Sequence, residues 1–324
     1  MASTTLFTYG PSNVDTLLAT TRSVLVQSKD YFNDAIFGHI PLFNILNKKL
    51  KVKKQGGASV LVPIIYGKNS TFRAYNRDDT LDTTGTEGLT MAQAKWVHYG
   101  GTITLYGDEL RLNSGDGKLQ DIIKAKTMQA VMSGRDALSI DLWGTSLNSK
   151  KIQPLDLLVD QTSSIQDINS TTNSWWQAQQ LTSGSFAAQG EADMRNLRDT
   201  IIRQGQNNVS APDEIITTQL ISELYEQSQA SGIRYGPRDQ ADGTFSSLKW
   251  STANVGFDNN CISGRLYMLS SDSLQFVVHS EADWNIGEFK EPVDQDMRSA
   301  KVIFTGQLVV LNRRRNGKMV SITA

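Results

Sequence analysis

The chain has 324 residues, of which 39% are hydrophobic and 20% are charged, so it is long enough for two packed units of ordinary globular composition. Its 32 lysines and arginines nearly balance its 33 acidic residues, which excludes a protein whose main task is to grip nucleic acid through a strong positive field. Cys261 is the only cysteine and no apolar run is long enough to cross a bilayer, which excludes an intrachain disulfide and a membrane-spanning helix.

The start of the chain predicts a loosely held arm. The first basic residue is Arg22, so the charged region that opens a signal peptide is missing and a reducing cytoplasm is favoured. The stretch VDTLLATTRSVLV is consistent with a short amphipathic helix. In DYFNDAIFGHIPLFNILNKKL the apolar residues follow helical spacing, but Gly38 and Pro41 interrupt it, so we predict two short helical pieces with a kink.

Residues 56–67 and 95–107 predict a long two-stranded arm. The first stretch, GGASVLVPIIYG, reads as a strand in which Pro63 indicates an edge position or a bulge. The second, KWVHYGGTITLYG, alternates Ile103 and Leu105 with more polar residues. We therefore expect a hairpin whose arms reach roughly 30 Å, with the residues between them at its tip.

The tip of this arm, TFRAYNRDDTLDTTGTEGLT at residues 71–90, is too polar to fold against its own chain. It lacks the ligand spacing of a calcium loop, so no metal site is predicted there. We expect contact with another subunit to order it, with aromatic side chains as anchors and charged ones fixing the register. The candidate contact residues are Phe72, Arg73, Tyr75, Arg77, Asp78 and Asp79.

Residues 118–144 predict the longest helix of the chain, about 40 Å in length. Apolar or small residues recur at spacings of three or four and form one stripe, which predicts burial along most of the helix. The residues assigned to the core by this pattern are Leu119, Ile123, Val131, Leu138 and Leu142.

The rest of the chain mixes helical and strand-like segments and predicts an α+β fold. EADMRNLRDTIIRQ and QLISELYEQSQ are helical, whereas DEIITT, RLYMLSS, LQFVVHS and AKVIFTGQLVVLN resemble strands. The last stretch, VVLNRRRNGKMVSIT, predicts a terminal hairpin with its turn at Asn316–Gly317.

Two shorter features leave alternatives. Arg313, Arg314 and Arg315 form either a phosphate-facing site or a solvated strand edge, and the edge is the commoner case. The Trp175–Trp176 pair indicates an anchor for a long connector rather than a platform for stacking bases.

No motif predicts catalysis. The three histidines are far apart in sequence and none lies beside the cysteine, so packing or surface roles are favoured over metal binding. The chain has no nucleophile elbow, phosphate-binding loop or dinucleotide fingerprint. We therefore predict a non-enzymatic protein with no catalytic residue, metal or cofactor.

The order of these segments resembles the major capsid proteins of tailed double-stranded DNA bacteriophages, which have the Hong Kong 97 type fold. The similar stretches are VHYGGTITLYGDEL before the long helix, PLDLLVDQTSSIQDINSTTNSWW after it, and the closing GQLVVLNRRRNGKM. The resemblance divides the chain into four parts. They are an N-terminal arm (1–50), an extended loop (51–107), a peripheral domain with the spine helix (108–150 and 291–324) and an axial domain (151–290).

The same resemblance implies a structural subunit that assembles with itself into hexamers and pentamers of an icosahedral virion capsid. It implies a separate scaffolding protein, a portal, in some phages a decoration protein, and packaged double-stranded DNA held without sequence specificity. Assembly is expected in the host cytoplasm, with no membrane. An encapsulin-type nanocompartment shell is the alternative within the fold, and a soluble enzyme or carbohydrate-binding domain is the alternative outside it.

Overall fold

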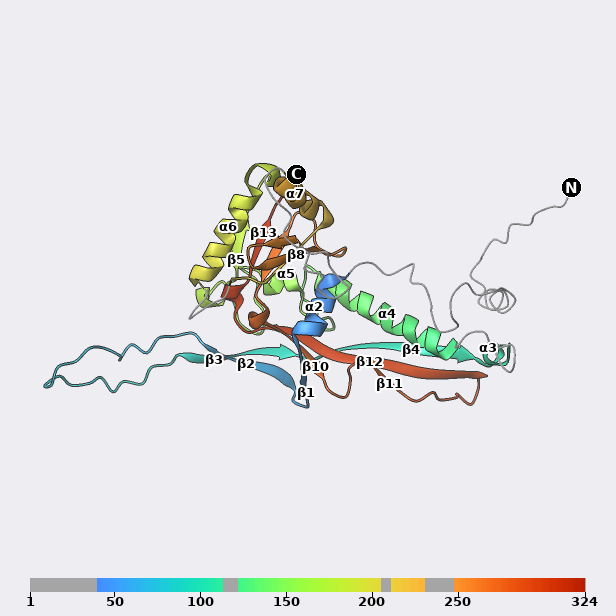
Figure 1. Ribbon diagram of the computed structural model, residues 1–324. Coiled ribbons are helices and arrows are strands. Elements are labelled where there is room, and N and C mark those ends of the chain that lie inside the picture. Colours follow the sequence, from blue (N-terminus) through green and yellow to red (C-terminus); the bar gives the residue numbers. More distant parts are fainter. Residues whose placement is uncertain (1–39, 113–121, 205–210, 231–247, 324) are drawn as a thin grey trace. The chain divides into compact units, whose positions relative to one another are not determined.

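The computed structural model describes residues 40–112, 122–204, 211–230 and 248–323 (Figure 1). They form two compact units. The first contains the described residues within 99–136 and 284–304, and the second contains all the others. Both units contain helices and strands, which confirms the predicted α+β class.

The first unit is built on strands that pair with β12 (Met297–Val310). β4 (Val97–Tyr106) pairs with it, and the short β11 (Asn285–Ile286) pairs with it in antiparallel register at Val302 and Ile303. Ile103 and Leu105 of β4 are buried, as their alternation with polar residues predicts. α3 (Gly107–Leu112) follows β4 directly, and α4 (Ile122–Leu142) begins in this unit.

A glycine in α4 makes room for an aromatic ring. A Cβ atom on Gly134 would lie 2.4 Å from a ring carbon of Trp284, far inside contact distance. The Trp284 ring stacks in turn on Phe304, with 4.9 Å between centroids. The position of Gly134 therefore requires a residue without a side chain.

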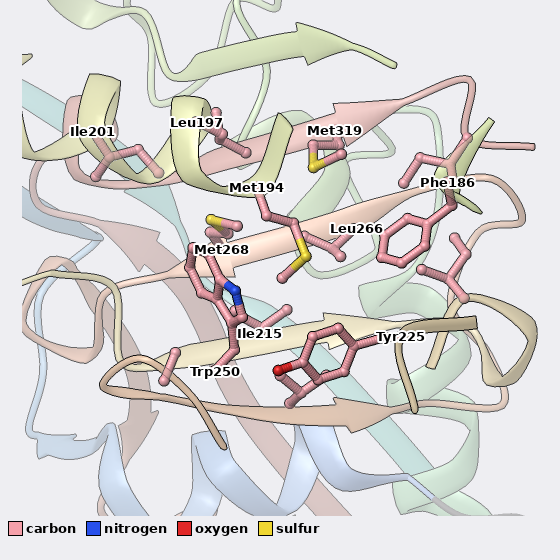
Figure 2. Packing of buried hydrophobic residues seen from close by; sticks show 14 residues of the cluster. Phe186, Met194, Leu197, Ile201, Ile215, Tyr225, Trp250, Leu266, Met268 and Met319 are labelled. Atoms are coloured by element: carbon pink, nitrogen blue, oxygen red, sulfur yellow. The ribbon is translucent and has the colours of Figure 1, made fainter. Parts of the chain in front are cut away.

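In the second unit, two helices pack on a six-stranded sheet. The helices are α6 (Phe186–Gln204) and α7 (Gln219–Ala230). The strand order is β5 (Gln179–Thr182), β13 (Gly317–Val320), β9 (Leu266–Leu269), β6 (Glu214–Thr217), β8 (Ala253–Phe257) and β7 (Leu248–Trp250). Met194, Leu197 and Ile201 of α6 lie in one buried cluster with Met268 and Met319 of the sheet (Figure 2). Their spacing of three and four residues places them on one helix face, which is why this segment folds as a buried-face helix.

The second unit also holds the entry of the described chain. α2 (Pro41–Lys49) begins with Pro41, which has no N–H and is tolerated in the first turn because N–H groups there have no partner within the helix. It ends with two lysines, whose positive charge is favourable at a helix C-terminus. β1 (Lys51–Lys54) then pairs in parallel with β10 (Leu274–His279), and β10 pairs antiparallel with residues 306–310 of β12. The remaining short elements are α5 (Leu155–Leu158), η2 (Ser174–Trp176), η3 (Ser271–Ser273) and η4 (Arg313–Arg315).

The extended arm has a different second strand from the predicted one. β2 (Ser59–Ile65) pairs antiparallel with β3 (Leu89–Lys95), whereas residues 97–106, the predicted partner, pair with β12. Ala92 and Ala94 are fully buried on the same face as Val62. Strand propensity, which is low for alanine, does not detect a strand whose buried side is made of such small side chains.

The prediction of a terminal hairpin is wrong. β12 and β13 pair with other strands and not with each other. Asn316 has φ of −120° and ψ of 149°, whereas the predicted turn needs a positive φ. Its buried side-chain oxygen instead accepts hydrogen bonds from the amide N–H of Ser270 and the hydroxyl of Ser273, both at 3.0 Å. The asparagine therefore joins distant segments.

The spine helix is confirmed, but continuous burial of its stripe is not. Leu138 and Leu142 are fully buried, Val131 is half-buried, and Ile123 is 44% exposed. Leu119 lies outside the described residues. The prediction of core burial is therefore wrong for Ile123 in the single chain. Helical periodicity identifies the apolar face, but it does not show whether the chain itself covers that face at every turn.

The division into four parts stays a prediction. β13 lies in the stretch assigned to the peripheral domain, yet it pairs with β5 and β9, which lie in the stretch assigned to the axial domain. The N-terminal arm lies mostly outside the described residues.

Candidate functional site

The β2–β3 hairpin presents an apolar face that the described chain leaves uncovered. Residues opposite each other in the register, such as Ile65 and Leu89, project on the same side. Leu61, Ile65, Leu89 and Met91 are 55%, 73%, 75% and 64% exposed. The exposed Pro63 lies opposite Met91 on the same side. We call these five residues the hairpin face; an exposed apolar cluster of this kind marks an interaction surface.

The loop between the strands, residues 66–88, contains no helix or strand. Phe72 is 93% exposed and Tyr75 is 63% exposed. The four charged candidates, Arg73, Arg77, Asp78 and Asp79, are exposed as well. Their role in subunit contacts stays a prediction, but the loop offers two large aromatic side chains that its own chain does not bury.

Local hydrogen bonds shape the loop. The guanidinium of Arg73 donates to the carbonyl of Thr80, and a carboxylate oxygen of Asp79 accepts from the amide of Asn76 at 2.8 Å. The hydroxyl and amide of Thr84 donate to Asp82 and lower the pKa of that carboxyl group. These bonds make turns. Phe72 and Tyr75 stay exposed despite them.

The base of the hairpin contacts the segment between α5 and β5, residues 159–178, which we call the connector. Tyr66 stacks on Trp175, with 5.2 Å between ring centroids and 23° between planes. The amide of Gln93 donates to the carbonyl of Gln166 at 3.0 Å. The neighbouring Trp176 is 1% exposed and its indole N–H donates to the carbonyl of Ile165 at 3.4 Å, which confirms the predicted anchor.

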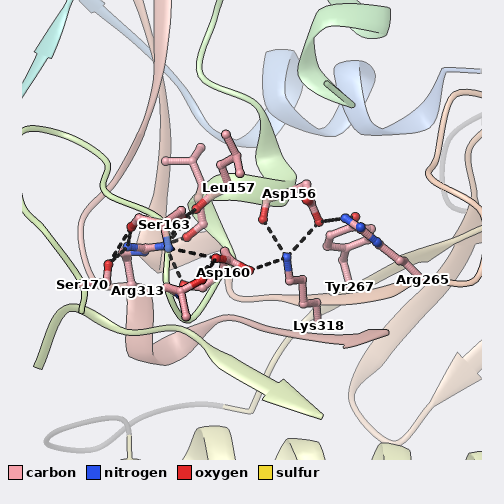
Figure 3. Close-up of polar contacts among 11 residues, drawn as sticks. Asp156, Leu157, Asp160, Ser163, Ser170, Arg265, Tyr267, Arg313 and Lys318 are labelled. Atoms are coloured by element: carbon pink, nitrogen blue, oxygen red, sulfur yellow. Dashed lines mark hydrogen bonds and ion pairs between the residues drawn. The ribbon is translucent and has the colours of Figure 1, made fainter. Parts of the chain in front are cut away.

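Neither interpretation of the arginine run fits Arg313. Its side chain is fully buried within the connector (Figure 3). Nη2 donates to the carbonyls of Leu157 and Asp160 at 2.8 and 2.6 Å, and Nε donates to the carbonyl of Leu158 at 2.9 Å. Nη1 donates to the carbonyl of Ser163 at 3.0 Å. Burial lowers the pKa of Arg313 to about 10, and the charge of Asp160 acts in the opposite direction.

Beside it, Lys318 lies between two carboxylates (Figure 3). Its ammonium is 3.0 Å from Asp156 and 2.8 Å from Asp160. Asp156 also accepts a hydrogen bond from the hydroxyl of Tyr267 at 2.9 Å and pairs with Arg265. Burial acts to raise the pKa of Asp160, but the hydrogen bond and charge of Lys318 outweigh it and hold the pKa at about 2. Polar groups of α5 and the connector are thus paired with groups of β9, η4 and β13.

Several features bear on catalysis and on membranes. Within the described ranges, no group of three or more histidine, cysteine or acidic side chains is placed to bind a metal ion. Burial raises the pKa of the Cys261 thiol and so disfavours the reactive thiolate. His39 lies outside the described residues. In the part of the chain that the structure describes, no helix is both long and apolar enough to span a bilayer.

Comparisons with known proteins identify the fold. No family model and no curated protein matches the sequence. A chain of the cyanophage A-1(L) capsid asymmetric unit has a TM-score of 0.64 at 15% identity, over 94% of this chain and 99% of that one. A capsid chain of a native GTA particle has a TM-score of 0.61 at 8% identity, over 93% and 96%. The SrpI encapsulin of Synechococcus elongatus has a TM-score of 0.59 at 8% identity, over 94% and 95%.

These matches span nearly the whole of each chain, so the chain has the fold of capsid proteins, as the resemblance in sequence order predicts. At identities this low, structural similarity establishes the fold alone, and the function has to be argued from the candidate site.

Proposed function

We propose that the chain is the shell subunit of a tailed-phage capsid, a structural protein that assembles with itself into hexamers and pentamers. The observation that carries the proposal is the hairpin face, together with the exposed Phe72 and Tyr75 of the loop. A chain that acted alone would leave this apolar surface in water. A shell in which each subunit covers its neighbour's hairpin would bury it.

The hairpin face is chemically suited to repeated contacts. Covering a large apolar side chain completely contributes about 1.5–3 kcal/mol, and these side chains have more than half of their surface left to cover. Such a contact is modest alone, but a closed shell repeats it at every subunit. The exposed charged residues Arg77 and Asp78 follow the aromatic residues in the loop and would fix the register of the contact.

Further partners belong to the same proposal. A separate scaffolding protein, a portal and packaged double-stranded DNA fit a capsid subunit, with a decoration protein in some phages, the virion as final location and the host cytoplasm as the place of assembly. An encapsulin-type shell is the second candidate, favoured by the near-complete fold match to the SrpI encapsulin. More of the similar structures are phage capsids, which favours the first candidate.

The test removes the hairpin face while leaving its buried side intact. Ile65→Lys combined with Leu89→Lys changes an exposed, directly opposed pair. We expect the subunit to keep its circular dichroism and thermal unfolding, and to form no regular shells by negative-stain microscopy. Gln189→Lys, an exposed change on α6, is the control and should assemble. Normal shells from the double variant, or a stable monomer from the wild type with and without scaffold, would reject the proposal.

A second variant isolates the loop. Replacing residues 72–88 by a short Gly-Ser turn should leave subunit unfolding nearly unchanged and abolish or deform the shells. Exchanging only residues 83–86 for glycine and serine keeps both aromatic side chains and should leave assembly intact. Shells of normal stability after the long replacement would show that the loop makes no essential contact. Particles that enclose protein cargo rather than DNA would favour the encapsulin candidate.

A further inference from the structure

The β2–β3 hairpin joins β1 through two glycines in an unusual conformation. Gly56 and Gly57 have φ of +66° and +86°, a region that only glycine adopts readily. A Cβ atom on Gly56 would meet nothing within 4 Å, so close packing is not the reason for this glycine. The pair instead has the backbone freedom of glycine, which the hydrogen bonds to its main chain restrict.

Two side chains make those hydrogen bonds. The indole N–H of Trp96 donates to the carbonyl of Gly57 at 2.9 Å. Nε2 of His279, at the end of β10, accepts from the amide of Gly56 at 3.4 Å. The two rings lie edge to face, with 5.9 Å between centroids and 76° between planes. Together they form a clasp around the glycine pair.

The His279 half of the clasp depends on an unprotonated ring nitrogen. Nδ1 of the same ring lies 3.3 Å from the amide nitrogen of Glu281, which is also a donor. A neutral imidazole has one acceptor nitrogen, and an imidazolium has none. We propose that Gly56–Gly57 is a hinge of the hairpin and that protonation of His279 releases it. In the tautomer whose Nε2 accepts from Gly56, Nδ1 already carries a hydrogen, so protonation of Nε2 removes the one acceptor of the ring.

The His279 ring is partly exposed to solvent and has several charged neighbours. His279 is half-buried and lines a cavity of about 630 Å³ with Lys95 and His98. Lys54 is its register partner on β1. Glu281 is the nearest acidic residue along the chain, and Asp283 is engaged by two other lysines: Lys51 and Lys53.

The second histidine of this cavity does not contact the hinge. Nδ1 of His98 is 2.9 Å from the hydroxyl of Thr305. Its titration leaves the hydrogen bonds of Gly56 and Gly57 in place, which makes it the matched control. The stack of Tyr66 on Trp175 and the bond of Gln93 to Gln166 contain no titrating imidazole. Protonation therefore frees the β1 end of the hairpin while its other attachments persist.

Hydrogen exchange of the unassembled full-length subunit tests the switch. Protection of residues 55–59, corrected for the intrinsic exchange rate, should fall about two- to tenfold from pH 8 to pH 5.5, the loss expected for one hydrogen bond. His279→Gln, whose side chain accepts a hydrogen bond but does not titrate, should abolish this pH dependence. His279→Asn is the second such variant if the first does not fold. His98→Gln should retain the fall seen in the wild type.

Three results would overturn the inference: no fall in the wild type, an equal fall in both His279 variants, or loss of the fall in His98→Gln. None of these measurements involves shells, so failure of the hinge and failure of the proposed shell function are distinguishable.

Discussion

Arg313→Met tests whether one buried guanidinium holds the connector in place. The substitution keeps an unbranched side chain of similar length but removes all five N–H donors. Four main-chain carbonyls then lose a donor: those of Leu157, Leu158, Asp160 and Ser163. An unsatisfied buried acceptor costs about 1–3 kcal/mol.

The size of the stability loss depends on which hydrogen bonds each carbonyl retains in the variant. The carbonyls of Leu157 and Ser163 still accept from serine hydroxyls at 2.6 and 2.7 Å, and that of Asp160 still accepts from the amide of Ala178 at 3.4 Å. The carbonyl of Leu158 keeps no other hydrogen-bond donor among the described residues. One orphaned acceptor plus several weakened ones gives a loss of about 3–5 kcal/mol, the range for breaking a buried charged network.

Urea unfolding of the unassembled subunit, followed by tryptophan fluorescence, measures this loss. Arg314→Met is the control, because Arg314 is the next residue, is half-buried, and its Nε has no hydrogen-bond partner in the described chain. It should cost less than about 1 kcal/mol. If Arg313→Met costs no more than the control, the connector does not depend on the guanidinium and the reasoning fails.

Three further predictions concern other parts of the fold. Leu138→Asp should prevent folding, whereas Ile123→Asp, on the exposed turn of the same helix, should leave a folded subunit; circular dichroism decides, and equal damage would refute the assignment. Gly134→Ala should lower the unfolding temperature, although alanine normally stabilises a helix by about 1 kcal/mol, because its methyl group meets Trp284; an unchanged or higher temperature would contradict this. The lowered pKa of Asp160 adds stability above about pH 4, and this stability is lost as the pH falls toward 2. Asp160→Asn should therefore make the urea midpoint depend less on pH over that range, and an unchanged dependence would contradict the prediction.

Segments with a strong periodic signal were predictable from sequence. EADMRNLRDTIIRQ lies in α6, because burial on one helix face leaves its period in the chain. DEIITT became β6, which is buried at every position and was signalled by its run of apolar and β-branched residues. The strand pairing of the extended arm was not predictable, since the two buried alanines, Ala92 and Ala94, carry no such signal. Nor was the role of Asn316: Asn-Gly is a strong local turn signal, but a buried side-chain bond to Ser270 outweighs it.

The candidate site divides in the same way. Exposure of Phe72 and Tyr75 followed from a stretch too polar to pack on itself. The apolar side of β3 was missed, although Leu89 and Met91 alternate with smaller residues and could have signalled it. Burial of Arg313 had no local signal at all, because its partners lie about 150 residues earlier in the chain and only the fold brings them together.

The hairpin combines an exposed apolar face with one blocked position on each main-chain edge, and this combination bears on how it would associate. A two-stranded sheet with free edges invites indiscriminate strand pairing. On β2, Pro63 has no N–H to offer a new strand. On β3, the amide of Gln93 is already bonded to the carbonyl of Gln166. Association is thereby directed away from the strand edges and toward the side chains of the hairpin face, where only a surface of matching shape binds well, as a closed shell of identical contacts requires.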